Sequence, residues 1–189
     1  MKTTKFLTAL FLIFAFGKAN AQADSAVETH TIGITIPAVA LVDVEGGTNI
    51  DMVFAAPTEA GLPIAPPADN STLWLNYSYI PSIGKSSSRI TVSISPIIAG
   101  VDIKVLAAGA PLAQGGGLRG TVSGSAVTLS TAPANFITAI GASYTGNGTS
   151  NGHQLTYSVV AEGNSTYEDL VEIAAASNQT TVTYTIVEN

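Results

Sequence analysis

Short segments in which apolar and polar residues alternate recur along this chain of 189 residues. They are rich in Val, Ile, Thr and Tyr, and turn-forming residues bound each one, which is typical of β-strands with one buried face. Their number and spacing predict an all-β fold, a single immunoglobulin-like antiparallel β-sandwich of about nine strands. The expected strands are 28–36, 38–45, 50–56, 72–80, 89–95, 101–107, 126–131, 153–161 and 180–188.

Glycine, proline and asparagine fill the segments between these strands. The proline-rich stretch 57–71 is expected to extend over the surface, and "AQGGGLRG" (113–120) to form a flexible loop. "YTGNGTSNGH" (144–153) is dense in Asn and Gly, which favour turns. The stretch "ANFITAI" (134–140) is predicted to form one short helix.

Residues 1–21 are predicted to be a signal peptide. Lys2 and Lys5 form a basic start, residues 6–16 are apolar but too few to span a bilayer, and "ANA" (19–21) is a small-residue cleavage site. The compact, lysine-rich signal is typical of bacteria. The protein is therefore expected to be exported to the periplasm, the cell surface or an extracellular fibre of a bacterium.

The mature chain is expected to begin at Gln22. Residues 22–36 then form an N-terminal extension or a first strand, and residues 37–189 form the sandwich domain. No membrane span is expected in this mature chain.

Cleavage at this site leaves four of the seven basic residues against 13 acidic residues, a formal net charge of −9. A chain this acidic repels nucleic acid and anionic lipid, so neither is expected as a partner. The chain has no cysteine, so its stability must come from a packed core instead of disulfides. With only 11% charged residues, its surface favours association with other proteins.

The residues that carry chemistry in enzymes form no convincing site. The G-x-S-x-G pattern at 148–152, with His153 directly after it, lacks the preceding strand and following helix that a nucleophilic serine needs. Ser150 and His153 are therefore interpreted as turn residues. His30 is the only other histidine, and no ligand spacing indicates a metal site. We expect no catalytic residue, no metal and no cofactor.

One predicted strand, 72–80, carries three aromatic residues. Tyr77 and Tyr79 share one face and Trp74 points to the other. Tyr77 and Tyr79 are candidate contacts for a glycan, because exposed aromatic rings stack on sugars. Trp74 is expected to lie in the core, as a lone Trp in a β-sandwich usually does.

The predicted strand at the start of the mature chain ends at a proline. Ile32, Ile34 and Ile36 lie on one face of it, and Pro37 interrupts the alternation before the next strand. Proline lacks an N–H and breaks a backbone ladder. One interpretation is that this segment pairs within its own domain, with Pro37 at a crossover between sheets. The other is that it pairs with a neighbouring molecule.

Two stretches resemble the major subunits of class 5 enterobacterial fimbriae. They are "VETHTIGITIPAVALVDVEGG" (27–47) and "LSTAPANFITAIGASYTGNGTSNGHQLTYSV" (129–159). The resemblance implies an incomplete sandwich completed by the N-terminal strand of the next subunit, with Ile32, Ile34 and Ile36 as donor residues. The chain is also similar to small secreted β-proteins of Bacteroidota. These bacteria O-glycosylate exported proteins at an Asp-Ser/Thr-apolar motif, which "DSA" (24–26) resembles.

The sequence thus predicts a non-enzymatic, exported structural or adhesive protein, which associates with itself into a fibre or with an outer-surface partner. The alternative is a monomeric carbohydrate-binding module that recognises a glycan through its aromatic residues or the 144–153 loop. An enzyme is disfavoured, because the chain offers no catalytic constellation.

Overall fold

The structure, a computed structural model, describes residues 27–111, 114–161, 167–172 and 179–189. The predicted signal peptide, the cleavage site before Gln22 and the "DSA" motif lie outside these residues. The chain divides into two units, residues 1–35 and 36–189. In the first unit, the described residues 27–35 contain no helix and no strand.

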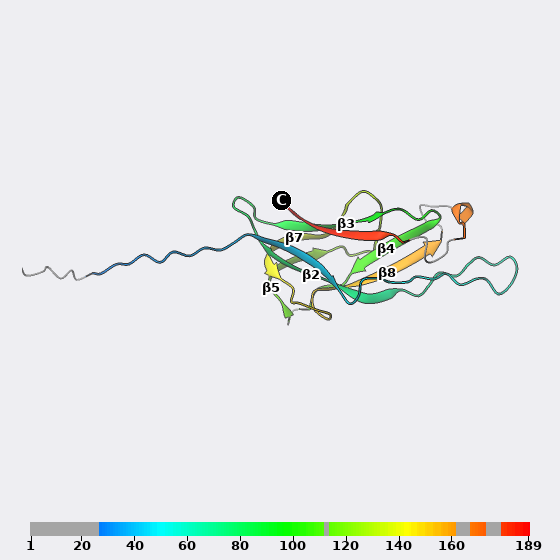
Figure 1. The fold of residues 1–189 in the computed structure, drawn as a ribbon, viewed down its shortest axis with the longest axis horizontal. Coiled ribbons are helices and arrows are strands. Elements are labelled where there is room, and N and C mark those ends of the chain that lie inside the picture. The colour runs from blue at the N-terminus through cyan, green and yellow to red at the C-terminus, as the bar shows by residue number, and fades with distance from the viewer. Residues whose placement is uncertain (1–26, 112–113, 162–166, 173–178) are drawn as a thin grey trace, which may run out of the picture. The chain divides into compact units, whose positions relative to one another are not determined.

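The second unit is all-β, as predicted, with nine antiparallel strands in one open sheet (Figure 1). The strands pair in the order β6-β4-β8-β2-β7-β3-β9, with β1 added to β2 and β5 added to β7. The described residues contain no α-helix and nothing long and apolar enough to cross a membrane as a helix. The strands are β1 (Val39–Glu45), β2 (Asn70–Ile80), β3 (Ser88–Ser95), β4 (Val101–Ala107), β5 (Gly116–Val122), β6 (Val127–Thr128), β7 (Ala134–Tyr144), β8 (His153–Ala161) and β9 (Thr181–Glu188).

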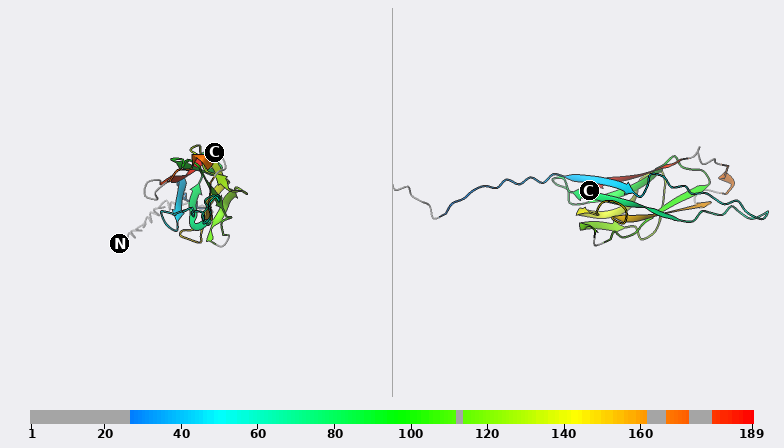
Figure 2. Two further views of the ribbon diagram at one scale, coloured as in Figure 1. Left: turned by 90° about the vertical axis from the view of Figure 1, so that its right-hand side faces the viewer. Right: turned by 60° about the horizontal axis from the view of Figure 1, so that its bottom comes forward.

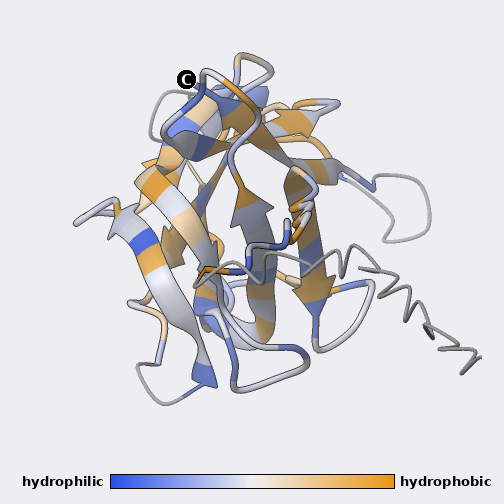
Figure 3. Ribbon diagram, turned by 90° about the vertical axis from the view of Figure 1, so that its left-hand side faces the viewer, coloured by the Kyte–Doolittle hydropathy of each residue, from blue (hydrophilic) through white to orange (hydrophobic). Residues whose placement is uncertain are grey.

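Alternation along the strands builds one hydrophobic core. In β2, Leu73, Leu75, Tyr77 and Tyr79 are buried, while Trp74, Ser78 and Ile80 on the opposite face are only half-buried. Their partners come from β3, β4, β7 and β8, so the sheet folds over and the inner faces of its two halves meet. Figure 3 shows the hydrophobic and hydrophilic residues alternating along the strands. Burial of this apolar surface is the main stabilising contribution in a chain without cysteine.

The predicted helix at 134–140 is wrong, because these residues belong to strand β7. Two irregularities in the pairing of β3 with β7 explain the misleading pattern. Ser88 and Ile90 lie opposite Ile140 and Ile137, so β7 has one extra residue there, and Ala139 has a φ of 55°. Such a bulge moves the next inward side chain from two to three positions along the strand. Buried residues at 136, 137 and 140 consequently imitate helical spacing.

The predicted flexible loop at 113–120 is also wrong from residue 116 onward, where strand β5 begins. Residues 112–113 lie outside the described part of the chain. Gly117 and Gly120 have φ values of 77° and 75°, and a Cβ at either position would clash with a backbone carbonyl of β7. The glycines therefore permit close pairing with β7 rather than disorder.

Two expected strands are absent from the described residues. Residues 28–36 form no strand, and segment 50–56 contributes only an isolated bridge between Ala55 and Ala65. The number of strands is nevertheless nine, as expected, because β5 and β7 are two strands that the sequence pattern does not predict. The other seven expected segments each contain a strand, although only Val127 and Thr128 pair within 126–131.

Two leucines on neighbouring strands test where the core lies. Leu75 on β2 is 0% exposed and Leu41 on β1 is 66% exposed. We expect Leu75→Ala to lower the free energy of unfolding by about 2–5 kcal/mol, because it removes buried contacts and leaves a cavity. Leu41→Ala is the matched control, with an expected change of about 0.5 kcal/mol or less. Denaturant unfolding of both variants measures this, and similar losses in both would contradict the assignment of the core.

Candidate functional site

The isoleucines of the N-terminal segment are exposed. Ile32, Ile34 and Ile36 are 73%, 82% and 73% accessible to solvent. No residue from 27 to 38 is assigned to a strand. The three exposed isoleucines thus form an apolar stripe at alternate positions of a β-prone segment.

Strands β1 and β9 each pair on one side only in the described chain. β1 pairs with β2 along its whole length, and β9 pairs with β3 along its whole length. The two strands lie next to each other, as Figure 2 also shows, but no ladder joins them within the described residues. Each strand therefore presents a row of backbone N–H and C=O groups that a further strand can pair with.

The side chains along these two strands cover the core incompletely. Residues on the inner faces of the central strands reach full burial, such as Leu75 and Ile90 at 0% exposure. The inward residues of β1 and β9 pack against the same core but stay only partly buried. They are Val42 and Val44 on β1, and Val182, Tyr184 and Ile186 on β9. Part of the surface of these apolar side chains thus remains exposed to solvent.

A carboxylate fixes the C-terminal end of β9. Glu188 accepts hydrogen bonds from the Ser82 N–H at 3.0 Å, the Ser82 hydroxyl at 2.9 Å and the Tyr79 hydroxyl at 3.2 Å. These bonds, those from Ser82 first, hold the pKa of Glu188 below its usual value, so the carboxylate stays ionised. The end of β9 is thereby tied to the turn between β2 and β3, which keeps the unpaired edge of β9 in a defined position.

The candidate glycan contacts Tyr77 and Tyr79 are buried in the core. Their side chains are 3% and 0% exposed, so neither ring presents a face on which a sugar can stack. Trp74, expected in the core, is only half-buried, because the inward face of β2 is the face of Leu73 and Leu75. The two faces of β2 are divided as predicted, but Tyr77 and Tyr79, not Trp74, lie on the face that meets the core.

The interpretation of His153 as a turn residue is wrong, because His153 is the first residue of strand β8 and its side chain is buried. It is 2% exposed, and its Nδ1–H donates to the carbonyl oxygen of Ala108 at 2.8 Å. Its Nε2 lies 3.1 Å from the Tyr77 hydroxyl, and the two rings stack with centroids 5.6 Å apart. Burial lowers the pKa of His153, so the ring is neutral. Ser150 is exposed with a φ of 66°, in the loop after β7, as expected of a turn residue.

The described residues contain no group of three or more His, Asp or Glu side chains that can hold a metal ion. The expected absence of catalysis stays a prediction, because no measured activity bears on it.

No family model, no curated protein and no solved structure matches this chain. The resemblance to fimbrial subunits consequently stays a prediction from the quoted residues.

The neutral state of His153 predicts the pH dependence of stability. Because the pKa is lower in the folded protein than in the unfolded chain, the unfolded state binds the proton more tightly. The contribution of His153 is complete above the unfolded pKa of about 6.5 and is lost as the pH falls below it. We expect the melting temperature to drop from pH 7.5 to pH 5.5, before Glu188 begins to titrate.

His153→Gln should flatten this decline, whereas the control His30→Gln should keep it, because His30 is an exposed residue of the N-terminal segment. Thermal melting of the three proteins across this pH range is the measurement. An unchanged pH profile in His153→Gln would show that another group causes the decline.

Proposed function

We propose that this protein is an exported, non-enzymatic structural or adhesive subunit of a bacterial surface, which polymerises by donating its N-terminal strand. The observation that carries the proposal is the exposed stripe of Ile32, Ile34 and Ile36, in a chain whose sheet has an incompletely covered apolar edge. In the proposed assembly, residues 28–36 of one molecule pair with the sheet of the next molecule.

We infer further that the nine strands form an immunoglobulin-like sandwich whose adjoining β1 and β9 edges leave backbone groups unpaired in the described chain, so that a further strand can join the sheet there. A donated strand at that position pairs with an unpaired backbone edge. Its isoleucines cover the partly buried residues Val42, Val44, Val182, Tyr184 and Ile186. Burial of three isoleucines contributes about 5–9 kcal/mol, at about 1.5–3 kcal/mol each, before the entropic cost of ordering the segment.

The β9 edge suits this pairing better than the β1 edge. β1 carries Asp43 and Glu45, and charges on an edge strand oppose pairing with further strands. In β9, residues 181–187 are uncharged, and Glu188 is occupied at the far end by Ser82 and Tyr79.

The proposed assembly has a direction, because the donated segment and the accepting edge are different parts of the molecule. Pro37 separates the donated segment from β1, which begins only two residues later at Val39. The segment and the accepting edge are different surfaces of the molecule, so each contact joins the head of one copy to the tail of the next. Contacts of this heterologous kind extend into an open fibre unless the rotation between copies closes a ring.

Paired substitutions in the N-terminal segment test the proposal. We expect Ile34→Asp in the mature protein to abolish polymerisation, because it places an unpaired charge against apolar surface at a cost of several kcal/mol. Thr35→Asp is the matched control, since it adds the same charge to the opposite face of the same strand. It should polymerise as the wild type does. Electron microscopy and size-exclusion chromatography over a range of concentrations provide the measurement.

Thermal melting of the same proteins as monomers completes the test. Strand donation requires that Ile34→Asp leave the monomer's melting temperature unchanged. A wild type that stays monomeric at every concentration, or a monomer that Ile34→Asp clearly destabilises, would refute the proposed donation.

A further inference from the structure

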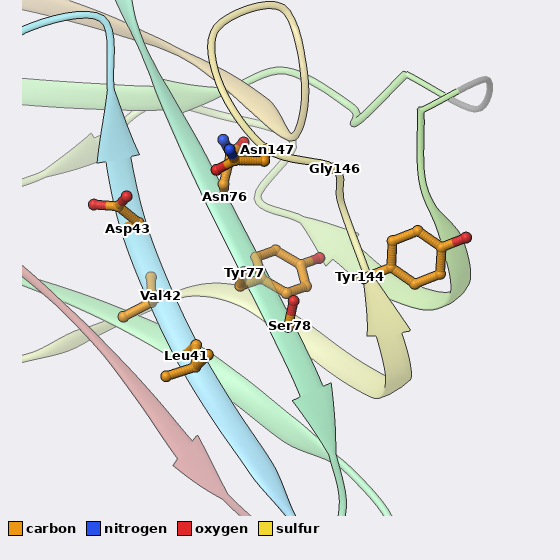
Figure 4. Close-up of a pocket in the computed structure, with 9 residues that line it drawn as sticks. All are labelled: Leu41, Val42, Asp43, Asn76, Tyr77, Ser78, Tyr144, Gly146 and Asn147. Carbon is orange, nitrogen blue, oxygen red and sulfur yellow. The ribbon is translucent and has the colours of Figure 1, made fainter.

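A row of four residues crosses the outer surface of the sheet from β1 to β5. Leu41 of β1 lies opposite Ser78 of β2, Ser78 lies opposite Tyr144 of β7, and Tyr144 lies opposite Gly116 of β5. Residues paired directly in antiparallel strands place their side chains on the same face. Figure 4 shows Leu41, Ser78 and Tyr144 in this order across the three strands.

Tyr144 is an exposed aromatic residue that its surroundings hold in place. Its side chain is 56% exposed. The outer part of the ring lies over Gly116, where an added Cβ would come within 2.9 Å of Cε1 and 3.2 Å of both Cζ and the hydroxyl. The glycine thus leaves the space that the tyrosine ring covers, and the ring keeps a surface open to solvent.

The residue after Tyr144 anchors it to the core. Thr145 is 0% exposed, its N–H donates to the Tyr77 carbonyl at 3.1 Å, and its hydroxyl accepts from the Tyr77 N–H at 3.0 Å. The loop that follows is also fastened, since the Asn76 side chain donates to the Gly148 carbonyl at 3.0 Å. The backbone beneath Tyr144 and the loop beside it are therefore positioned before any ligand arrives.

Two hollows adjoin this tyrosine, with volumes of about 510 Å³ and 420 Å³. Tyr144 and Ser78 line both hollows, so they form the ridge between them.

The larger hollow combines apolar and polar groups. Leu41 is 66% exposed there and lies on the far side of Ser78 from Tyr144. Asp43 and Asn147 are exposed in the same hollow, and Oδ1 of Asp43 accepts the Val44 N–H at 2.8 Å. Carboxylate, amide and hydroxyl groups thus line the same hollow as one aromatic ring and one leucine.

We propose that this face, which we call the Tyr144 face (Leu41, Asp43, Ser78, Tyr144 and Asn147), binds a neutral carbohydrate chain. A pyranose ring presents C–H groups on its face and hydroxyls around its rim. The C–H groups pack on the negative face of the tyrosine ring, and the hydroxyls hydrogen-bond with Asp43, Ser78 and Asn147. A chain of sugars lies over the ridge, with units in both hollows.

Charge selects a neutral polymer over an anionic one. None of the described residues that line the two hollows is Lys, Arg or His, and Asp43 adds a negative charge to the larger hollow. The whole sequence carries a formal net charge of −6 even with its basic N-terminus. Phosphate, sulfate or uronate groups would therefore meet repulsion at this face. The proposal does not depend on strand donation, because it uses other residues.

Affinity electrophoresis of the mature protein tests the site, with hydroxyethylcellulose, xylan, galactomannan and β-1,3-glucan as neutral probes and heparin as the anionic control. We expect at least one neutral polysaccharide to retard the wild type. Tyr144→Ala should weaken that interaction about tenfold or more, because it removes the stacking ring. Tyr144→Phe should keep the interaction within about threefold, since the ring rather than the hydroxyl makes the contact.

Tyr167→Ala is the control for loss of an exposed aromatic ring elsewhere, since Tyr167 is 39% exposed and lines neither hollow. It should bind as the wild type does. Ile34→Asp should also bind, which separates failure of this site from failure of strand donation. Thermal melting establishes that each variant is folded.

Three results would overturn the proposal. The first is a wild type that none of the four neutral polysaccharides retards. The second is retardation that persists unchanged in the folded Tyr144→Ala variant. The third is retardation by heparin alone, which would replace a neutral ligand with an anionic one.

Discussion

Strand β2 is the element on which the rest of the sheet depends, because three other strands pair with it. β8 pairs with its first half, β7 with Ser78 and Tyr79 near its end, and β1 with the opposite edge from Trp74 to Ile80. Where β8 leaves and β7 arrives, Thr145 bonds both backbone groups of Tyr77. This junction lets one continuous sheet fold over onto itself, so that the side chains of both halves share a core. In a chain without cysteine, no covalent link substitutes for it.

Most of this architecture could be predicted from the sequence, and the failures have specific physical causes. The alternation in segments such as 89–95 and 101–107 survives into β3 and β4, because a regular strand keeps its period of two. In β7 the bulge at Ala139 disturbs that period, and a bulge depends on the partner strand, which no single segment encodes. The glycines of β5 look like a loop in isolation and become informative only when β7 lies beside them.

The candidate site was predictable to a lesser extent. Pattern alone identified Ile32, Ile34 and Ile36 as a stripe that needs a partner, and it isolated them at Pro37. It did not reveal that the candidate glycan contacts Tyr77 and Tyr79 face the core. Alternation defines two faces of a strand without showing which face the rest of the sheet covers. Tyr144 begins the Asn- and Gly-rich stretch 144–153, whose composition predicts a turn. Its exposure and its place opposite Gly116 follow from the pairing of β7 with β5, and neither strand follows from its own segment alone.

Strand pairing at the sheet edges and ligand binding on the Tyr144 face have different requirements within this one small protein. An edge that accepts a strand must keep apolar groups such as Val182 and Ile186 partly uncovered, which risks indiscriminate pairing. The charges of Asp43 and Glu45 on β1 limit that risk at one edge, and Asp43 also belongs to the Tyr144 face. A single carboxylate on β1 thus opposes pairing along the strand edge and offers a hydrogen-bond acceptor across the sheet surface. The two roles are compatible because strand pairing uses the backbone in the plane of the sheet, whereas a ligand on the face meets the side chains that rise from it. A fibre built through the edges would therefore leave the Tyr144 face of every subunit open to solvent, so that many weak sites act together along one polymer.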